Sequence, residues 1–437
     1  MTFLPNHREK ILFPFAAFEH NHHPTFPDIA VSQPGRDLTC ADWQDISSLL
    51  QATPEAGDDP FRKSGLKHCE TLVQMAIGAR GLTVSHGYLA AYMIGVYGEN
   101  GRIVRFDHSA VVASPLFSLR KNPEYLQRFL WRFVHPIVGN TVVGCDPTSR
   151  QLTDAEHKWV VGRLQGAAEA TSHEEGLCRR VEVFDTVEDG APSRAFFLFK
   201  LIDINARLLS RATTVWLAIE DPRTLVNGNL SSFPEQPGDL ALVIVKDAWR
   251  QLVRKNERVF YDRLAQTVPD DEWTALPRIV CGCDLGEREM AQRLISGLDT
   301  GASSSSGAPI TLLPRPPAPP MTPTHHPSTP PQSSPLTPLS SSSAGPPTPN
   351  PPPKQSCFSS PLTPIDDATP PPTLRLPQQQ TYTWRELVGE TQRQRHRERS
   401  HTRLVIDTVG RRLTRFRSTY EFVLALRDAI RGTTSLF

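Results

Sequence analysis

The stretch DLALVIVKDAWR, residues 239–250, decides how the chain is interpreted, because it combines an apolar strand with one charge. Leu240 to Val245 are six apolar residues rich in the β-branched type, which is typical of a buried strand. Lys246 follows directly, and the residues after it have a helical period over 248–266. We therefore expect a strand that ends at Lys246, a helix that starts at once, and a specific partner for the lysine.

Glu257 is the partner that the sequence offers. The expected helix places Val253, Phe260 and Leu264 on one apolar face. Glu257 falls on that face, at spacings of 4, 3 and 4 residues along the set. A charge inside an apolar stripe needs an opposite charge, so we expect Glu257 to pair with Lys246. The alternative is a lysine that extends into solvent beside a solvated glutamate.

The neighbouring segments extend this strand into a sheet. Runs of strand type at 194–203 and 213–220 predict, together with the strand before Lys246, an antiparallel meander. Another short strand is expected at 277–284. A meander with a lysine on its third strand, followed by a helix, indicates the small lobe of a protein kinase. In such a lobe the lysine holds the α- and β-phosphates of ATP and a helix glutamate orients it.

The remaining chain predicts a mixed α/β module in front of this lobe and a long insert within it, so the fold class expected is α+β. Helical periods and a Gly/Asn turn, GENG, between two apolar runs support the module. Ser, Thr and Pro dominate the insert, which cannot bury enough apolar area to order itself. The expected boundaries are a tail over 1–25, an accessory module over 26–170, the lobe over 194–297, a disordered insert over 298–380, and a last strand, hinge and helix over 381–437.

Composition limits the function classes. The formal net charge of +1 over 437 residues gives no bias toward nucleic acid. The 7 scattered cysteines argue against a disulfide framework, and the close pair Cys281 and Cys283 has no second pair with which to bind zinc. Neither a signal peptide nor a membrane span is evident, so we expect an intracellular protein, cytoplasmic or nuclear. The segment PRPPAPP (314–320) is a candidate for docking into an SH3-type groove, or a passive spacer.

Three separated segments resemble the fungal-type protein kinase family. GRIVRFDHSAVVASPLF (101–117) is similar to a family segment with an Asp-Arg-Ser-Gly core, although His108 and Ala110 replace its Arg and Gly. VIVKDAWR (243–250) resembles a Val-Ile-Lys-Asp-Ser-Trp block. RLVIDTVGRRLTRFRSTYEFVLALRDAIRG (403–432) resembles the family's strand, hinge and following helix. The likeness runs in order from about residue 26 to the end, apart from the insert.

The resemblance implies ATP and Mg²⁺ as cofactors, Ser/Thr phosphorylation as the activity, and specific roles for residues. Lys246 would be the phosphate lysine, with Glu257 as its partner. The loop that covers the phosphates would include Arg211, Ala212, Thr213 and Val215. The hinge against the adenine would consist of Asp407, Thr408, Val409 and Gly410.

The chain departs from the family pattern in two places. The covering loop LLSRATTVWLA (208–218) has no glycine, where the family often has one at the position of Ala212, and glycine lets backbone amides approach phosphates. The sequence also ends before a catalytic loop and a magnesium aspartate, since HRE (396–398) and DLG (284–286) both precede the hinge. We expect DLG to be a turn, and the chain to be inactive as it stands.

Three alternatives remain open at this stage. The first is a non-enzymatic regulatory or interaction module, in which a partner protein covers the apolar face of the helix over 418–432. The second is an active kinase whose large lobe is lost from the gene model. The third is a nuclease in the accessory module, because FPDIAVS (26–32) weakly resembles a metal-binding nuclease strand; the Glu-x-Lys strand that should follow is missing, which argues against nuclease chemistry.

Overall fold

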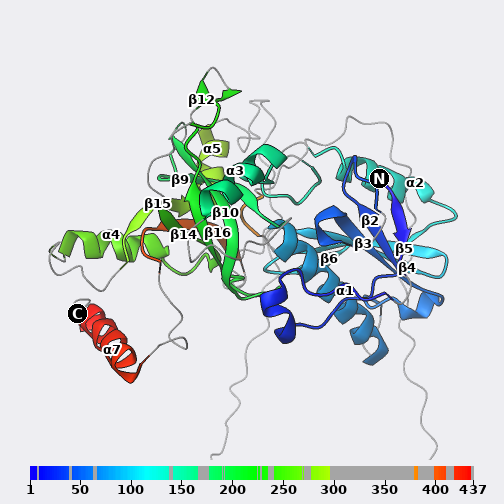
Figure 1. Cartoon of the computed structure of the whole chain (residues 1–437). Helices are drawn as coiled ribbons and strands as arrows, with labels where there is room; N and C mark the ends of the chain where they lie inside the picture. Colours follow the sequence, from blue (N-terminus) through cyan, green and yellow to red (C-terminus); the bar gives the residue numbers. More distant parts are fainter. Residues whose placement is uncertain are drawn as a thin grey trace, which may run out of the picture. The chain divides into compact units, whose positions relative to one another are not determined.

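The structure is a computed structural model, and it describes residues 1–6, 9–38, 42–62, 66–136, 141–165, 177–188, 190, 192–223, 225–226, 229–234, 241–267, 269, 277–295, 378–381, 398–409 and 418–434. All of these belong to one compact unit, formed by Met1–Gly301 and Arg375–Phe437. They form two large sheets and a short ribbon (Figure 1). Residues 298–377 of the expected insert, including 314–320, lie outside the described residues.

The first sheet belongs to the accessory module and has the strand order β1-β2-β3-β4-β5-β6, with β7 paired to β5. Only the β3–β4 pair is parallel among the described pairings of this sheet, because helix α1 (Leu66–His86) connects these two strands. The expected hairpin around GENG is confirmed as β4 and β5. The strands are β1 (Phe3–Pro5), β2 (Ile29–Ser32), β3 (Ile46–Thr53), β4 (Ala91–Tyr97), β5 (Asn100–Phe106), β6 (Val111–Ala113) and β7 (Phe117–Ser118).

The second sheet contains strand β14, which includes Lys246, and its strand order is β15-β16-β14-β11-β10-β9-β8. The meander β10-β11-β14 is antiparallel, as predicted. Strands β8 and β9 were not expected, since the chain around them is polar, but every second residue of β9 is buried. The strands are β8 (Ser149–Gln151), β9 (Arg179–Phe184), β10 (Ser193–Ile204), β11 (Thr214–Glu220), β14 (Leu242–Gln251), β15 (Ile279–Asp284) and β16 (Arg399–Ile406); β12 (Leu225–Val226) and β13 (Asn229–Leu230) form the ribbon.

Further helices accompany the two sheets. Thr153 caps α3 with a complete capping box, in which the Thr153 hydroxyl accepts from the Glu156 amide and the Glu156 carboxylate accepts from the Thr153 amide. None of the described helices is long and apolar enough to cross a bilayer. The helices are α2 (Pro123–Phe133), α3 (Asp154–Leu164), α4 (Glu257–Thr267), α5 (Leu285–Ile295) and α7 (Thr419–Thr434), with short 3-10 turns at Ala16–Asn21, Trp43–Asp45 and Ala56–Asp58.

The expected tail over 1–25 is part of the folded structure. Strand β1 pairs with β2, and a bridge joins Ile11 to Thr25. Phe15 is fully buried in the core of the second sheet, with its ring 5.4 Å from that of Trp216. Burial of one such ring stabilises a fold by about 1.5–3 kcal/mol, so the segment is ordered by packing.

Two local expectations next to the insert were wrong. DLG at 284–286 is not a turn: Asp284 is the last residue of β15, and helix α5 begins at Leu285, where the Asp284 carboxylate accepts a hydrogen bond from the Glu287 amide. The end of the expected disordered insert is ordered, since Gln380 forms a bridge with Ser400 and the amides of Gln378 and Gln379 bind Glu289. Five described cysteines, Cys69, Cys145, Cys178, Cys281 and Cys283, form no disulfide.

Candidate functional site

Lys246 lies in the middle of strand β14 and not at its end. The strand continues to Gln251, because residues 244–251 pair in register with β16. The helix expected over 248–266 therefore begins only at Glu257. The ladder to β16 outweighs the local helical period, since it satisfies the backbone groups of a segment whose side chains are buried.

The predicted pair forms. The ammonium group of Lys246 donates to both carboxylate oxygens of Glu257, at 2.6 and 2.8 Å. The lysine side chain is 22% exposed and the glutamate 28%, so both ions border solvent. The turn over 252–256 brings Glu257, the first residue of α4, back over the strand.

The prediction that Glu257 interrupts a buried apolar face of the helix was nevertheless wrong. Val253 lies in the turn and is 48% exposed, and Phe260 is 49% exposed. Only Leu264 of the expected apolar face is buried. Glu257 meets Lys246 because of the turn before α4, and not because it interrupts a buried stripe.

A cavity of about 510 Å³ opens beside this pair. Its lining is net positive, because it contains five cations and Glu257 is the one carboxylate among the lining residues; Arg250 is also paired with Asp284, at 2.6 Å, and with Glu287. Such a cavity favours an anion with several charges. The lining comprises five cations, one carboxylate and three further residues: Arg211, Lys246, Arg250, Arg254, Lys255, Glu257, Gln251, Phe260 and Thr402.

The loop between β10 and β11 borders the cavity through Arg211, whose guanidinium lies 3.7 Å from Glu257. Ala212 has a positive φ of 39°, in the left-handed region that favours glycine. The carbonyl of Arg211 accepts a hydrogen bond of 2.7 Å from the Trp249 amide, which ties the loop to β14. Thr213 accepts from the amide of Asn205, and Val215 stands opposite Lys246 in strand β11.

The expected hinge follows strand β16 directly. Asp407, Thr408 and Val409 are exposed, and the amide of Asp407 already donates to the carbonyl of Arg278 at 3.1 Å. Gly410 lies outside the described residues. The structure therefore places the expected hinge, the lysine and the covering loop at one sheet, with β14 between the loop and the strand that leads to the hinge.

The opposite face of β14 is joined to the accessory module. The indole of Trp249 packs against the ring of His108, with centroids 4.6 Å apart, and stacks on the ring of His401, at 5.0 Å. The Nδ1–H of His108 donates to the carbonyl of Leu208 in the covering loop, at 2.9 Å. Burial lowers the pKa of His108 to about 3, so the ring is neutral near pH 7. The accessory module thus holds the backbone of the loop that borders the cavity.

Charged side chains complete this joint. The guanidinium of Arg403 is 2% exposed and lies 2.7 Å from Asp247 and 2.9 Å from Asp146. Burial opposes ionisation of Asp247, but the nearby Arg403 outweighs it and lowers the pKa of the carboxyl. The three segments that suggested a family thus meet here, through His108, Asp247 and Arg403; the residue types alone did not reveal that contact.

Metal ligands do not gather at the cavity. The described residues contain no group of three His, Cys, Asp or Glu side chains that could hold a metal ion. Glu257 is the one carboxylate among the residues that line the cavity, and it is engaged by Lys246. Asp28, the carboxylate of the segment FPDIAVS (26–32) that weakly resembles a nuclease strand, accepts hydrogen bonds from Gln51 and the Ala52 amide, which is a structural role.

Comparison with known proteins agrees with the chemistry of this site. Residues 39–437 match the profile of a family described as fungal protein kinase. No curated protein matches the chain, and no solved structure matches it either. The match includes the whole lysine-bearing sheet and the first sheet from β3 onward, whereas β1 and β2 precede residue 39.

Proposed function

Because the chain belongs to the fungal protein kinase family, we propose that it binds ATP, with the phosphates at Lys246. The observation that carries this proposal is the ion pair of 2.6 Å between Lys246 and Glu257. A carboxylate that holds a lysine on the third strand of the meander is the arrangement by which kinases orient the phosphate-binding ammonium group. The positive cavity beside the pair supports an anionic ligand.

The proposed roles of the remaining residues follow from their positions. Arg211, Ala212, Thr213 and Val215 would cover the phosphates, with the Arg211 guanidinium as an additional cation. The segment from Asp407 to Val409 would contact the base. The left-handed backbone at Ala212 supports the covering role, because a loop of this shape commonly uses glycine at that point.

We also propose that the described site binds nucleotide without transferring phosphate. Phosphoryl transfer depends on metal ions that neutralise developing charge and on a residue that orients the acceptor. Magnesium would supply that neutralisation when bound, but the residues that line the cavity do not fit it, since Glu257 is already paired. Lys246 therefore binds and orients the phosphates, and no later step is assigned.

A regulatory role through protein binding is the second candidate. Tyr420, Val423 and Leu426 of helix α7 are 73%, 54% and 40% exposed. Apolar side chains of this kind on one helix favour a partner surface. A monodisperse monomer that does not bind a dye for exposed apolar surface would argue against this candidate.

Nucleotide binding is tested by thermal shift on the full chain. ATP should raise the melting temperature of the wild type, because a ligand selective for the folded state stabilises it. Lys246→Met should abolish the shift, whereas Lys121→Met, at an exposed lysine in the accessory module, should retain it. An equal shift in Lys246→Met would contradict the proposed site. Transfer of labelled phosphate to a Ser/Thr substrate, lost in Lys246→Met, would contradict the inactive assignment.

A further inference from the structure

We infer that helix α3 covers the base-binding part of the proposed nucleotide site, and that the buried carboxylate of Glu156 holds it there. This inference rests on the proposed function, because it concerns access to the same site.

The path of a bound nucleotide follows from strand register. Successive strand residues point to opposite faces, so Ile244 shares a face with Lys246. Ile244 stands opposite Leu217 in β11 and opposite Ile406 in β16, the residue before the expected hinge. A nucleotide with its base at the hinge and its phosphates at Lys246 must therefore lie along these three apolar side chains.

That surface is covered. Val160 and Leu164 of α3 pack into one core cluster with Leu217, Ile244 and Ile406. Leu217 is 2% exposed, Ile244 7% and Ile406 9%. The cavity beside Lys246 extends instead toward Arg250 and Thr402. The phosphate end of the proposed site is open, and the base end is closed.

Aromatic packing adds to the cover. The indole of Trp159 stacks on Phe233, with ring centroids 4.7 Å apart, and lies 5.7 Å from Phe197 of β10. Trp159 is only partly buried, whereas Phe197 is fully buried. The helix thus places an aromatic side chain and two aliphatic ones on the apolar face of the second sheet, where a planar base would otherwise pack.

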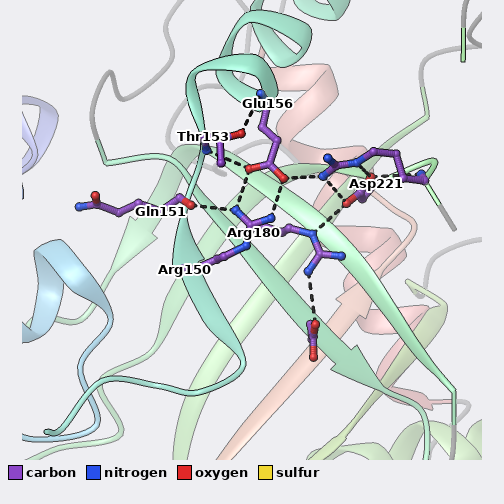
Figure 2. A network of polar contacts seen from close by, with 8 residues as sticks. Arg150, Gln151, Thr153, Glu156, Arg180 and Asp221 are labelled. Carbon is purple, nitrogen blue, oxygen red and sulfur yellow. Dashed lines mark hydrogen bonds and ion pairs between the residues drawn. The ribbon is translucent and has the colours of Figure 1, made fainter. Parts of the chain in front are cut away.

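The first turn of α3 is anchored by the network in Figure 2. Glu156 is 1% exposed and accepts from both terminal nitrogens of Arg150, at 2.6 and 2.7 Å. It also accepts from the Thr153 amide at 2.9 Å and from Arg223 at 2.5 Å. Burial opposes ionisation of Glu156, but hydrogen bonds from Arg150 and Arg223 outweigh it and lower its pKa to about 2.

Arg223 carries this anchor to the sheet. Its guanidinium contacts Glu156 in α3 and Asp221, at 2.8 Å, directly after strand β11. Asp221 is held in turn by the Nε of Arg180 in β9, at 2.8 Å (Figure 2). Removal of the Glu156 charge leaves Arg150 and Arg223 without their shared partner, which weakens the contact between helix and sheet without altering the sheet face itself.

Nucleotide affinity should then depend on the fraction of molecules in which α3 is displaced. The observed dissociation constant equals the intrinsic one divided by the competent fraction, so a weaker anchor raises affinity. Glu156→Gln should lower the dissociation constant of a fluorescent ATP analogue for the full chain by about tenfold. Glu220→Gln is the matched control, since Glu220, the last residue of β11, forms an exposed pair with Arg194 of β10, and it should change affinity by less than about twofold.

Two further measurements complete the test. Trp159→Ala should also raise affinity, and it replaces Glu156→Gln if a thermal melt shows that the latter does not fold. Hydrogen exchange over 154–164 should speed up in the wild type when the nucleotide analogue is added. Wild-type binding that neither Glu156→Gln nor Trp159→Ala improves, with unchanged exchange in α3, would overturn the inference and leave the proposed function intact. No binding by the wild type or either variant would overturn both.

Discussion

On one face of strand β14, Asp247 is compensated by an arginine that is 2% exposed; on the other face, Lys246 pairs with one glutamate beside a cavity. The first face is filled by side chains of the accessory module, and its charges have more than one partner. The second face keeps its charges at the solvent boundary. Alternate residues of one strand thus serve different tasks, since rigid support on one side leaves the other side available for a ligand.

The largest expected effect is on stability, at the supported face. Arg403→Met should lower the free energy of unfolding by about 3–5 kcal/mol, because it leaves Asp146 and Asp247 without their shared cation in a buried joint. Chemical denaturation measures the loss. Arg194→Met, which removes an exposed pair, should cost less than about 1 kcal/mol. Equal losses in the two variants would show that the buried joint at Arg403 contributes no more to stability than an exposed ion pair.

Lys246→Met should have a small effect on stability and a large effect on ATP affinity. Its effect on the free energy of unfolding should stay within about 1 kcal/mol, since both partners of the pair border solvent. Its affinity for ATP should fall at least about tenfold, which corresponds to about 1.4 kcal/mol. Calorimetric titration and denaturation of the same preparation measure both values. A large loss of stability would mean that Lys246 belongs to the structural set.

The pH dependence of stability should report the supported face. Burial lowers the pKa of His108 to about 3, so the unfolded chain binds a proton below about pH 6.5 that the folded chain does not. Stability should therefore fall as pH decreases from about 6.5, by about 1.4 kcal/mol per pH unit from this one group. His108→Asn should reduce that slope by about one proton. An unchanged slope would show that His108 is already protonated in the fold.

Ala212→Gly, in the loop between β10 and β11, should have the smallest effect on stability. Glycine removes the strain of a left-handed alanine, and the greater freedom of the unfolded chain offsets part of the gain. We expect a net stabilisation of about 0.5 kcal/mol, measured by thermal melting. Ala206→Gly, at a buried residue of the same loop whose φ is not positive, should destabilise instead. Destabilisation by both changes would argue against a strained loop.

Sequence alone predicted the strands of the second sheet that have a strong local pattern. The meander was predictable because long apolar runs rich in β-branched residues mark its strands. Strand β9 was missed although its alternation of Val181 and Val183 with charged residues was visible, since the surrounding chain is polar. The start of α4 was misplaced because the ladder to β16 holds residues 248–251 in a strand, which no local signal reveals.

The sequence predicted which residues form the central ion pair of the candidate site, but not the long-range contacts around that pair. Lys246 and Glu257 pair as expected, but the turn before α4 and not a buried stripe brings them together. The contact of His108 with the covering loop joins residues 100 positions apart, and the core cluster that contains both Val160 and Ile244 joins residues about as distant. Contacts of this range depend on the tertiary arrangement, which periodicity does not encode.

The most direct test of the central claim is chemical labelling of lysines by an ATP analogue that carries a reactive acyl group on its terminal phosphate. The full chain is labelled, digested and analysed by mass spectrometry, with and without excess ATP. We predict that the side-chain amine of Lys246, in its deprotonated form, attacks the acyl carbon and forms an amide while ATP leaves, and that excess ATP suppresses this reaction. Labelling spread over exposed lysines away from the cavity, such as Lys10 and Lys121, with Lys246 unmodified and no competition by ATP, would contradict the account.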